Sequence, residues 1–162
     1  MTSPIPALSK GINTMEIGGG VVPSPFPAAT KHVAGLVNGV QTDLTSIYFA
    51  DKILITVSQG GRLAQWIQVP LSSASPTAFD TALPSGETDM LPLTHLTPKT
   101  LLGAGGDKRE TIGHLYASQI ASAIVKRNPE ETRTLMVGFG LEKVDMEREA
   151  FFDLVELVHK VI

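Results

Sequence analysis

The clearest pattern in the sequence lies between residues 39 and 69, where apolar and polar side chains alternate along three successive segments. These segments cover residues 40–49, 53–58 and 62–69, and two short turns separate them. Alternation with a period of two is typical of β-strands, and the pair Gly60-Gly61 supplies the positive φ that a tight hairpin loop needs. The pattern therefore predicts a β-meander.

Further strands flank this meander. Residues 32–37 form an apolar run that the dipeptide Asn38-Gly39, a strong hairpin signal, joins to the meander. Residues 97–102 and 133–139 have the composition of two more strands. We therefore expect a sheet of five to six strands.

Two segments follow helical spacing instead. The first begins at Asp107, which we interpret as the N-cap, with Glu110 three residues later, and it ends before Asn128-Pro129. The second begins at an Asp145 cap and continues to the end of the sequence. Apolar side chains recur every three to four residues in both, as expected for amphipathic helices that cover a sheet.

The order β-β-β-β-α-β-α predicts an α+β fold in which two amphipathic helices pack on an antiparallel β-meander. Residues 1–30, rich in proline and glycine, are expected to form a flexible N-terminal tail. Residues 31–162 are expected to form a single domain. Four prolines between positions 70 and 95 predict a mobile insertion loop there.

Both faces of the predicted sheet carry apolar side chains. A hairpin closed by Gly60-Gly61 pairs Ile55 with Trp66 and sorts the side chains into two faces. The less polar face, which we expect the helices to cover, holds Leu44, Tyr48, Ile53, Ile55, Val57 and Trp66. The opposite face holds Ile47, Phe49, Leu54, Leu63 and Ile67, mixed with Thr45, Thr56 and Gln65.

The second face has no predicted cover within the chain, unless the loop or the tail folds over it. Apolar patches of this kind usually mark interaction sites. Trp66 fits equally well as an anchor in an interface or as a core residue. The predicted partner or dimer interface is therefore Ile47, Phe49, Leu54, Leu63, Ile67 and Trp66.

Composition and charge exclude several classes of function. The chain has no cysteine and a net charge of −3, and no run of Lys and Arg exceeds two residues. Nucleic-acid binding needs clustered cations, so no nucleic-acid partner is expected. No apolar stretch is long enough to span a bilayer, so we expect no membrane partner. We expect a cytoplasmic protein, with the nucleus as a second compartment.

The search for catalytic chemistry finds no convincing motif. The four histidines, His32, His95, His114 and His159, have no companions with the spacing of a metal site. His114 lies opposite the apolar stripe of its helix and is expected to be solvated. The segment 103–106 before the first helix lacks the Lys-Ser/Thr of a phosphate-binding loop, so we interpret it as a hinge. We expect no catalytic residue, no metal and no cofactor.

Taken together, these residues resemble the proteasome assembly chaperone 3 family. The resemblance rests on Gly39-Val40-x-Thr42, on Phe49-x-x-x-Ile53-Leu54-Ile55-x-Val57-x-Gln59-x-Gly61, and on Leu101-Leu102-Gly103 ahead of the first helix. It covers roughly residues 31–162. The proline-rich N-terminus and the 70–95 insertion depart from the family pattern and suggest a divergent, fungal-like member.

The resemblance implies a non-enzymatic chaperone. Members of this family pair with a related chaperone, proteasome assembly chaperone 4, and help place α-type subunits in the α ring of the 20S core particle. The expected partners are therefore a chaperone 4-like protein, or a second copy of this chain, and α-type subunits. Two alternatives stay open: a longin- or roadblock-like dimeric scaffold in trafficking or signalling, and a small-ligand enzyme that uses the glycine-rich segment 103–106.

Overall fold

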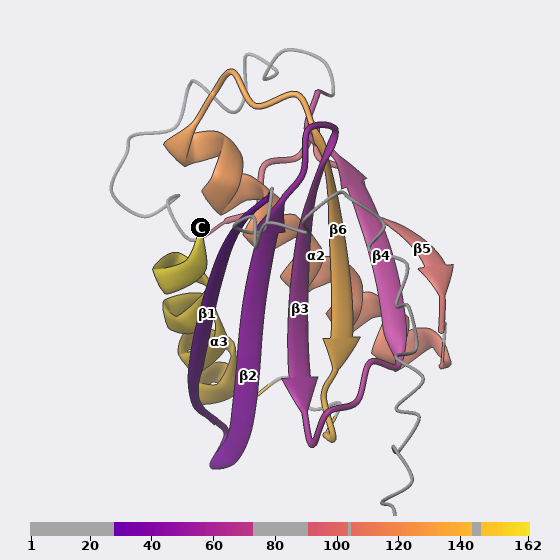
Figure 1. Cartoon of the computed structure of the whole chain (residues 1–162). Coiled ribbons are helices and arrows are strands. Elements are labelled where there is room, and N and C mark those ends of the chain that lie inside the picture. Colours follow the sequence, from indigo (N-terminus) through magenta and orange to yellow (C-terminus); the bar gives the residue numbers. More distant parts are fainter. Residues whose placement is uncertain (1–27, 73–90, 104, 144–146) are drawn as a thin grey trace, which may run out of the picture.

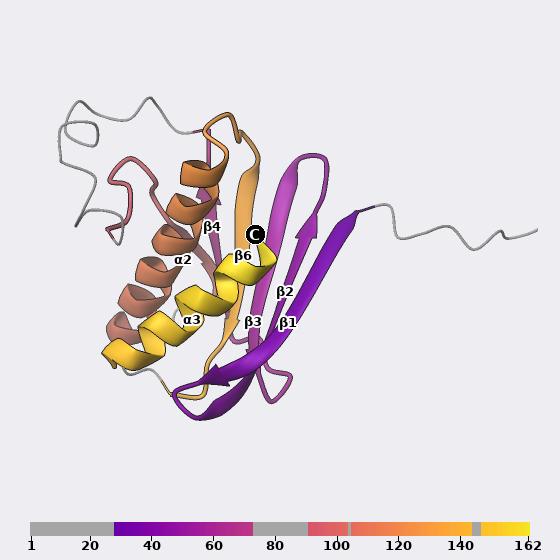
Figure 2. The same cartoon turned by 90° about the vertical axis from the view of Figure 1, so that its left-hand side faces the viewer.

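The structure is a computed structural model that describes residues 28–72, 91–103, 105–143 and 147–162. It consists of one sheet with two helices packed on one side (Figures 1 and 2). The elements in chain order are β1 (Ala29–Val37), β2 (Val40–Tyr48), β3 (Lys52–Gln59), β4 (Gln65–Pro70), β5 (Lys99–Leu102), α2 (Asp107–Arg127), β6 (Thr134–Gly140) and α3 (Arg148–Val161). The predicted α+β class is confirmed.

The six strands lie in the order β1-β2-β3-β6-β4-β5. Strand β6 pairs in parallel with β3 and antiparallel with β4, so the sheet is mixed, whereas we predicted it to be antiparallel throughout. The expected β3–β4 hairpin is wrong, because β6 lies between these two strands (Figure 1). Gly60 and Gly61 do have positive φ, of 60° and 72°. Their loop crosses the end of β6 instead of closing a hairpin, and the Ala64 N–H donates to Phe139 O at 2.8 Å.

This insertion reverses the two faces of β4. Trp66 is opposite Gly138 and Ile67 is opposite Val137, which in turn is opposite Ile55. Ile67 is fully buried, and Gln65 is also buried. The predicted face of every β4 residue was therefore wrong, since a register shift of one residue exchanges the faces of a strand.

The hairpin between β1 and β2 is as predicted. Asn38 and Gly39 both have positive φ, 51° and 72°, as a type I′ turn requires. The resulting register places Val33 opposite Leu44 and Val37 opposite Val40.

The first helix begins differently from the prediction. Its N-cap is Gly106, and no side chain caps it, so Asp107 is the first helical residue and not the cap. Asp107 and Glu110 still place negative charge in the first turn, where the helix dipole favours it. The predicted Asp145 cap of the last helix lies outside the described residues, and α3 begins at Arg148 after Glu147.

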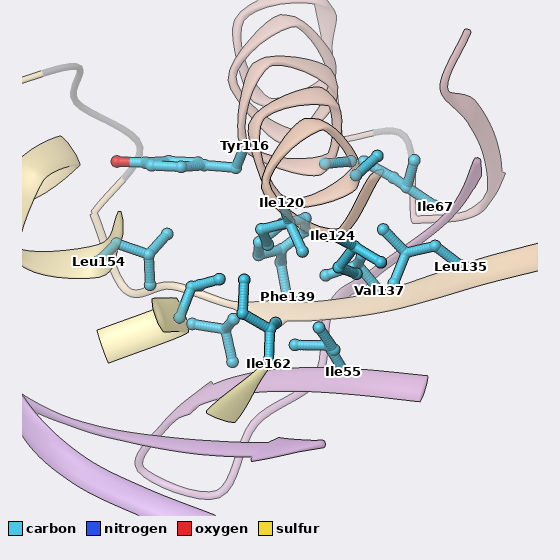
Figure 3. Packing of buried hydrophobic residues seen from close by; sticks show 14 of the residues in the cluster. Ile55, Ile67, Tyr116, Ile120, Ile124, Leu135, Val137, Phe139, Leu154 and Ile162 are labelled. Carbon is cyan, nitrogen blue, oxygen red and sulfur yellow. The ribbon is translucent and has the colours of Figure 1, made fainter. Parts of the chain in front are cut away.

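The core lies between the sheet and the two helices (Figure 3). From the sheet it takes the alternate residues of β3, β4 and β6, which are fully or almost fully buried: Ile53, Ile55, Val57, Ile67, Val69, Leu135, Val137 and Phe139. From the helices it takes one face of each, including Ile120 and Leu154. The prediction that the helices cover the face of Leu44, Ile53, Ile55 and Val57 is confirmed.

Most of the predicted 70–95 loop lies outside the described residues, as do residues 1–27 of the predicted tail. The described ends of that loop pack on the core. Leu71 is buried, and the Leu93 N–H donates to Ser122 Oγ on α2 at 2.7 Å. The short strand expected at 97–102 is present as β5.

Candidate interaction surface

The side of the sheet away from α2 and α3 is not covered by any described element (Figure 2). We call this side of the sheet, with the side chains that point outward from it, the open face. The register aligns one row of side chains across four strands: Thr30 on β1, Ile47 on β2, Leu54 on β3 and Met136 on β6. Ile47, Leu54 and Met136 are half-buried and adjacent, so they form a continuous apolar strip across the middle of the sheet.

A second row lies beside the first and contains Trp66. It runs through Thr45, Thr56, Gly138, Trp66 and Leu102. A Cβ atom at Gly138 would lie 3.0 Å from the ring of Trp66, so the indole packs directly on the backbone of β6. Leu102 on β5 is 67% exposed and extends the apolar surface beyond Trp66.

Polar side chains border this surface on the β1 side. His32 Nε2 lies 3.4 Å from Asp43 Oδ1, and both side chains are about half exposed. An apolar centre with a polar border is the usual composition of a protein–protein interface. The open face is therefore suited to binding another protein.

The six residues predicted as an interface fall into three groups. Ile47, Leu54 and Trp66 come together on the open face. Phe49 and Leu63 are about 40% exposed, but they lie beyond opposite ends of β3. Each could therefore border the open face only at its own end of the sheet. The prediction that Ile67 belongs to the interface is wrong. Ile67 is a core residue, because β4 pairs with β6 and this pairing points Ile67 toward the helices.

Sequence reasoning missed Met136, Gly138 and Leu102. The alternation along 134–140 could have identified Met136 as facing away from Leu135 and Val137. Its position beside Leu54, however, depends on the β3–β6 pairing, which joins segments about eighty residues apart and which no local pattern reveals.

An ion pair fixes one end of the sheet, next to the turn that contains Phe49. The Arg133 guanidinium donates from Nε to Glu131 Oε1 at 2.8 Å and from Nη2 to Oε2 at 2.7 Å. Its Nη1 donates to Phe49 O at 3.0 Å, across the turn between β2 and β3. Glu131 is buried, and the hydrogen bonds from Arg133 hold the pKa of its carboxyl below the ordinary value.

The histidines have structural partners. His114 Nε2 lies 2.8 Å from Thr100 Oγ1, so His114 joins α2 to β5 and is not the solvated residue we predicted. His159 Nδ1 contacts Val155 O at 2.7 Å within α3. Within the described ranges, no three His, Asp or Glu side chains are grouped as a metal ion would require.

The glycine-rich segment before α2 has a backbone role at its first position. A Cβ atom at Gly103 would lie 1.9 Å from Ala64 O, and Gly103 has a positive φ of 77°. Only glycine permits this close approach to the connection between β3 and β4. The position therefore has a structural explanation that does not involve a phosphate.

None of the described helices is both long and apolar enough to cross a membrane. No protein-family model and no curated protein matches the chain.

The architecture belongs to the class of α+β sheets with helices on one side. The fold is similar to a chain in the crystal structure of a chaperone complex for yeast 20S proteasome assembly, with a TM-score of 0.54 and 15% sequence identity. The match covers 81% of this chain and 96% of that chain. At this identity the likeness shows that the two chains share a fold.

Proposed function

We propose that this protein is a non-enzymatic assembly chaperone of the 20S proteasome. In this proposal it dimerises with a related small chaperone through the open face and helps place α-type subunits in the α ring, in the cytoplasm or the nucleus. Three findings support it: the fold shared with a chain of a proteasome assembly chaperone complex, the family resemblance of residues 31–162, and the uncovered apolar strip.

The open face carries the dimerisation part of the proposal. Ile47, Leu54 and Met136 form a continuous apolar strip with Trp66 beside it. A partner that excludes water from these half-buried apolar side chains would make association favourable. A large aromatic residue near the centre of such a surface is a typical hot spot. The first partner to test is a related chaperone, and the second is another copy of this chain.

The biochemical test is Leu54→Asp together with Ile47→Asp. A carboxylate in the middle of the apolar strip would lose its hydration in the dimer, so we expect each substitution to weaken dimerisation by about 100-fold or more. Leu91→Asp is the matched control, because Leu91 is an exposed leucine outside the open face. Light scattering coupled to gel filtration, with and without the candidate partner, gives the oligomeric state.

A dimer that survives both substitutions, in a variant with an unchanged circular dichroism spectrum, would show that the interface lies elsewhere. The same assay on the protein alone distinguishes a homodimer from a chain that needs a different partner.

The cellular test is gentle purification of the tagged protein followed by mass spectrometry. We expect α-type proteasome subunits and a second small chaperone, with few mature β subunits. Recovery of GTPases without proteasome subunits would overturn the proposal in favour of a longin- or roadblock-like scaffold, which would also use a one-sided sheet to dimerise.

A further inference from the structure

The two edge strands of the sheet, β1 and β5, differ in length and regularity. Strand β5 has four residues, and a register shift opposite Trp66 and Ile67 leaves Leu101 without a partner on β4. Strand β1 has nine residues, and each of them pairs with β2 without a bulge. Short strands and bulges are devices that prevent an edge from pairing with another chain. Strand β1 has neither device, so its outer edge is suited to receive a further strand.

The backbone of β1 alternates between groups that bond to β2 and groups that point away from the sheet. Val37 and Val40 flank the two-residue turn, so they form a hydrogen-bonded pair, and every second residue of β1 before Val37 bonds to β2 in the same way. The intervening residues direct their N–H and C=O groups outward: Thr30, His32, Ala34 and Leu36. Among the described residues, none supplies a hydrogen-bond partner for these outward groups. Figure 2 looks onto this edge, which no described helix or strand covers.

The side chains of β1 leave room for another strand to approach. Ala34 is small, and Gly35 has no side chain because Leu157 of α3 takes its place: a Cβ atom at Gly35 would lie 2.7 Å from Leu157 Cδ2. A lysine that projects from an edge strand discourages pairing. Lys31, however, turns back onto the end of α3, where its Nζ donates to Ile162 O at 3.0 Å. It therefore does not block the edge.

The sequence of β1 is complementary to itself when two copies run antiparallel and are centred on Val33, the middle residue of the strand. In this register every outward-pointing residue is opposite another outward-pointing residue, as hydrogen-bonded pairs require. Each pair of unlike residues near the centre then joins a larger side chain to a smaller one: Leu36 with Thr30, His32 with Ala34, and Lys31 with Gly35 of the second copy. No lysine is directly opposite a lysine, where like charges would destabilise the pairing.

We propose that the outer edge of β1 pairs with β1 of a second copy of this chain, antiparallel and centred on Val33, so that the two sheets become one. The row of backbone donors and acceptors requires an extended strand, and the second copy carries the same row in the register that satisfies both. Residues opposite each other in a sheet share a face, so both open faces lie on the same side of the joined sheet. The inference does not rest on the proposed proteasome function, since it uses the backbone of an edge.

The test is Ala34→Pro, because the N–H that proline removes points outward and makes no bond to β2. It is made in the full chain carrying Leu54→Asp, which removes association through the open face. We expect the Leu54→Asp protein to be a dimer by light scattering coupled to gel filtration, and the added Ala34→Pro to weaken this dimer at least about tenfold. Ala34→Ser is the matched control: it keeps the N–H and a small side chain, and it leaves the dimer unchanged.

Hydrogen exchange of the backbone amides gives a second readout that needs no substitution at the edge. In the dimer, the outward amides of His32, Ala34 and Leu36 are expected to exchange slowly, like the amides of Val33 and Gly35 that bond to β2. Dilution to the monomer is expected to return the outward amides to fast exchange, while the inward amides stay protected. This alternation distinguishes strand pairing at β1 from any other way of forming a dimer.

A monomeric Leu54→Asp protein would overturn the proposal, as would a dimer that persists when Ala34→Pro is added and the circular dichroism spectrum is unchanged. Slow exchange of the outward amides in a monomer would also overturn it, because another part of the same chain would then occupy the edge. Association through the open face is measured separately, in protein that carries Ala34→Pro. Its absence there would count against the proposed function and leave the result at the edge unaffected.

Discussion

The two faces of strand β3 differ sharply although their residues alternate along one segment. Ile53, Ile55 and Val57 point toward the helices and have no exposed surface. Leu54, Thr56 and Ser58 point the other way and are half-buried. On the covered side these three residues are all aliphatic, whereas on the open face the strand carries one large apolar residue, Leu54, followed by two small hydroxyl residues.

This difference separates two uses of apolar residues. On the covered face, each side chain is surrounded within the chain, and its removal leaves a cavity. On the open face, Leu54 and Trp66 are only half-surrounded, so their contribution to folding is smaller and most of their remaining surface is available to a partner. Apolar content alone would not distinguish the two.

The sharpest way to test the comparison is Ile55→Ala against Leu54→Ala. The first removes a fully buried side chain and is expected to lower the free energy of unfolding by about 3–4 kcal/mol. The second is expected to lower it by about 1 kcal/mol in the monomer, because neighbouring atoms surround only part of the side chain. Urea denaturation measures both values.

The denaturation should be repeated at two protein concentrations, since association through the open face would make the stability depend on concentration. Equal losses for the two variants, independent of concentration, would show that the open face is covered in the free protein.

A second comparison uses two glycines of β6: Gly140, at the end of the strand, and Gly138, on the open face, whose effect is expected to be the smallest. A Cβ atom at Gly140 would lie 1.7 Å from Arg62 O, in the backbone that crosses the end of the strand. That backbone cannot move aside without disturbing the connection between β3 and β4, so Gly140→Ala is expected to cost about 3 kcal/mol of stability. Thermal or urea denaturation gives the value, and a cost below about 1 kcal/mol would contradict the crossing.

The Glu131–Arg133 pair gives a pH-dependent test at one end of the sheet. Because the folded-state pKa of Glu131 lies below its ordinary value, the pair stabilises the fold above that ordinary value, and this stability is lost as the pH falls through the folded-state pKa. Glu131→Gln is expected to cost about 2 kcal/mol at neutral pH.

The difference in unfolding free energy between wild type and Glu131→Gln is expected to shrink as the pH is lowered below the ordinary pKa of a glutamate side chain, about 4.3, and through the lower folded-state pKa of Glu131. A difference that stays constant over this range would mean that the loss comes from packing and not from the charge of the carboxylate.

The smallest expected effect is that of Gly138→Ala, on the open face. The new methyl group would lie 3.0 Å from the Trp66 ring, which can shift by a few tenths of an ångström. We expect a loss of about 1 kcal/mol or less, a change in tryptophan fluorescence and weaker dimerisation. Trp66 is the single tryptophan, so the fluorescence reports on this position alone. An unchanged spectrum would contradict the packing of the indole on β6.

Local patterns were enough to predict most elements of the fold. The alternation in 40–58 gave the right faces for Leu44, Ile53, Ile55 and Val57, and Asn38-Gly39 gave the right turn. Helical spacing predicted both α2 and α3, since each has one face that packs on the sheet.

What local patterns could not supply was the neighbour of each strand. Gly60-Gly61 is compatible with a hairpin and also with a loop over an intervening strand, because positive φ occurs in both. That ambiguity placed Trp66 on the face expected to be covered and Ile67 on the opposite face, the reverse of what the structure shows. Of the predicted interaction surface, Ile47, Leu54 and Trp66 do lie on the open face, whereas Ile67 does not. The role of this face in binding stays a prediction.

The parallel pairing of β3 with β6 also has a consequence for how the chain is made. Ile55 on β3 cannot pair with Val137 on β6 until Val137 has been synthesised, roughly eighty residues later. Until then β3 is an unprotected edge, and β4 and β5 can pair only with each other. During synthesis the nascent protein thus leaves an apolar strand unpaired along one edge for several seconds at least, and this is the interval in which it would depend on cellular folding helpers of its own.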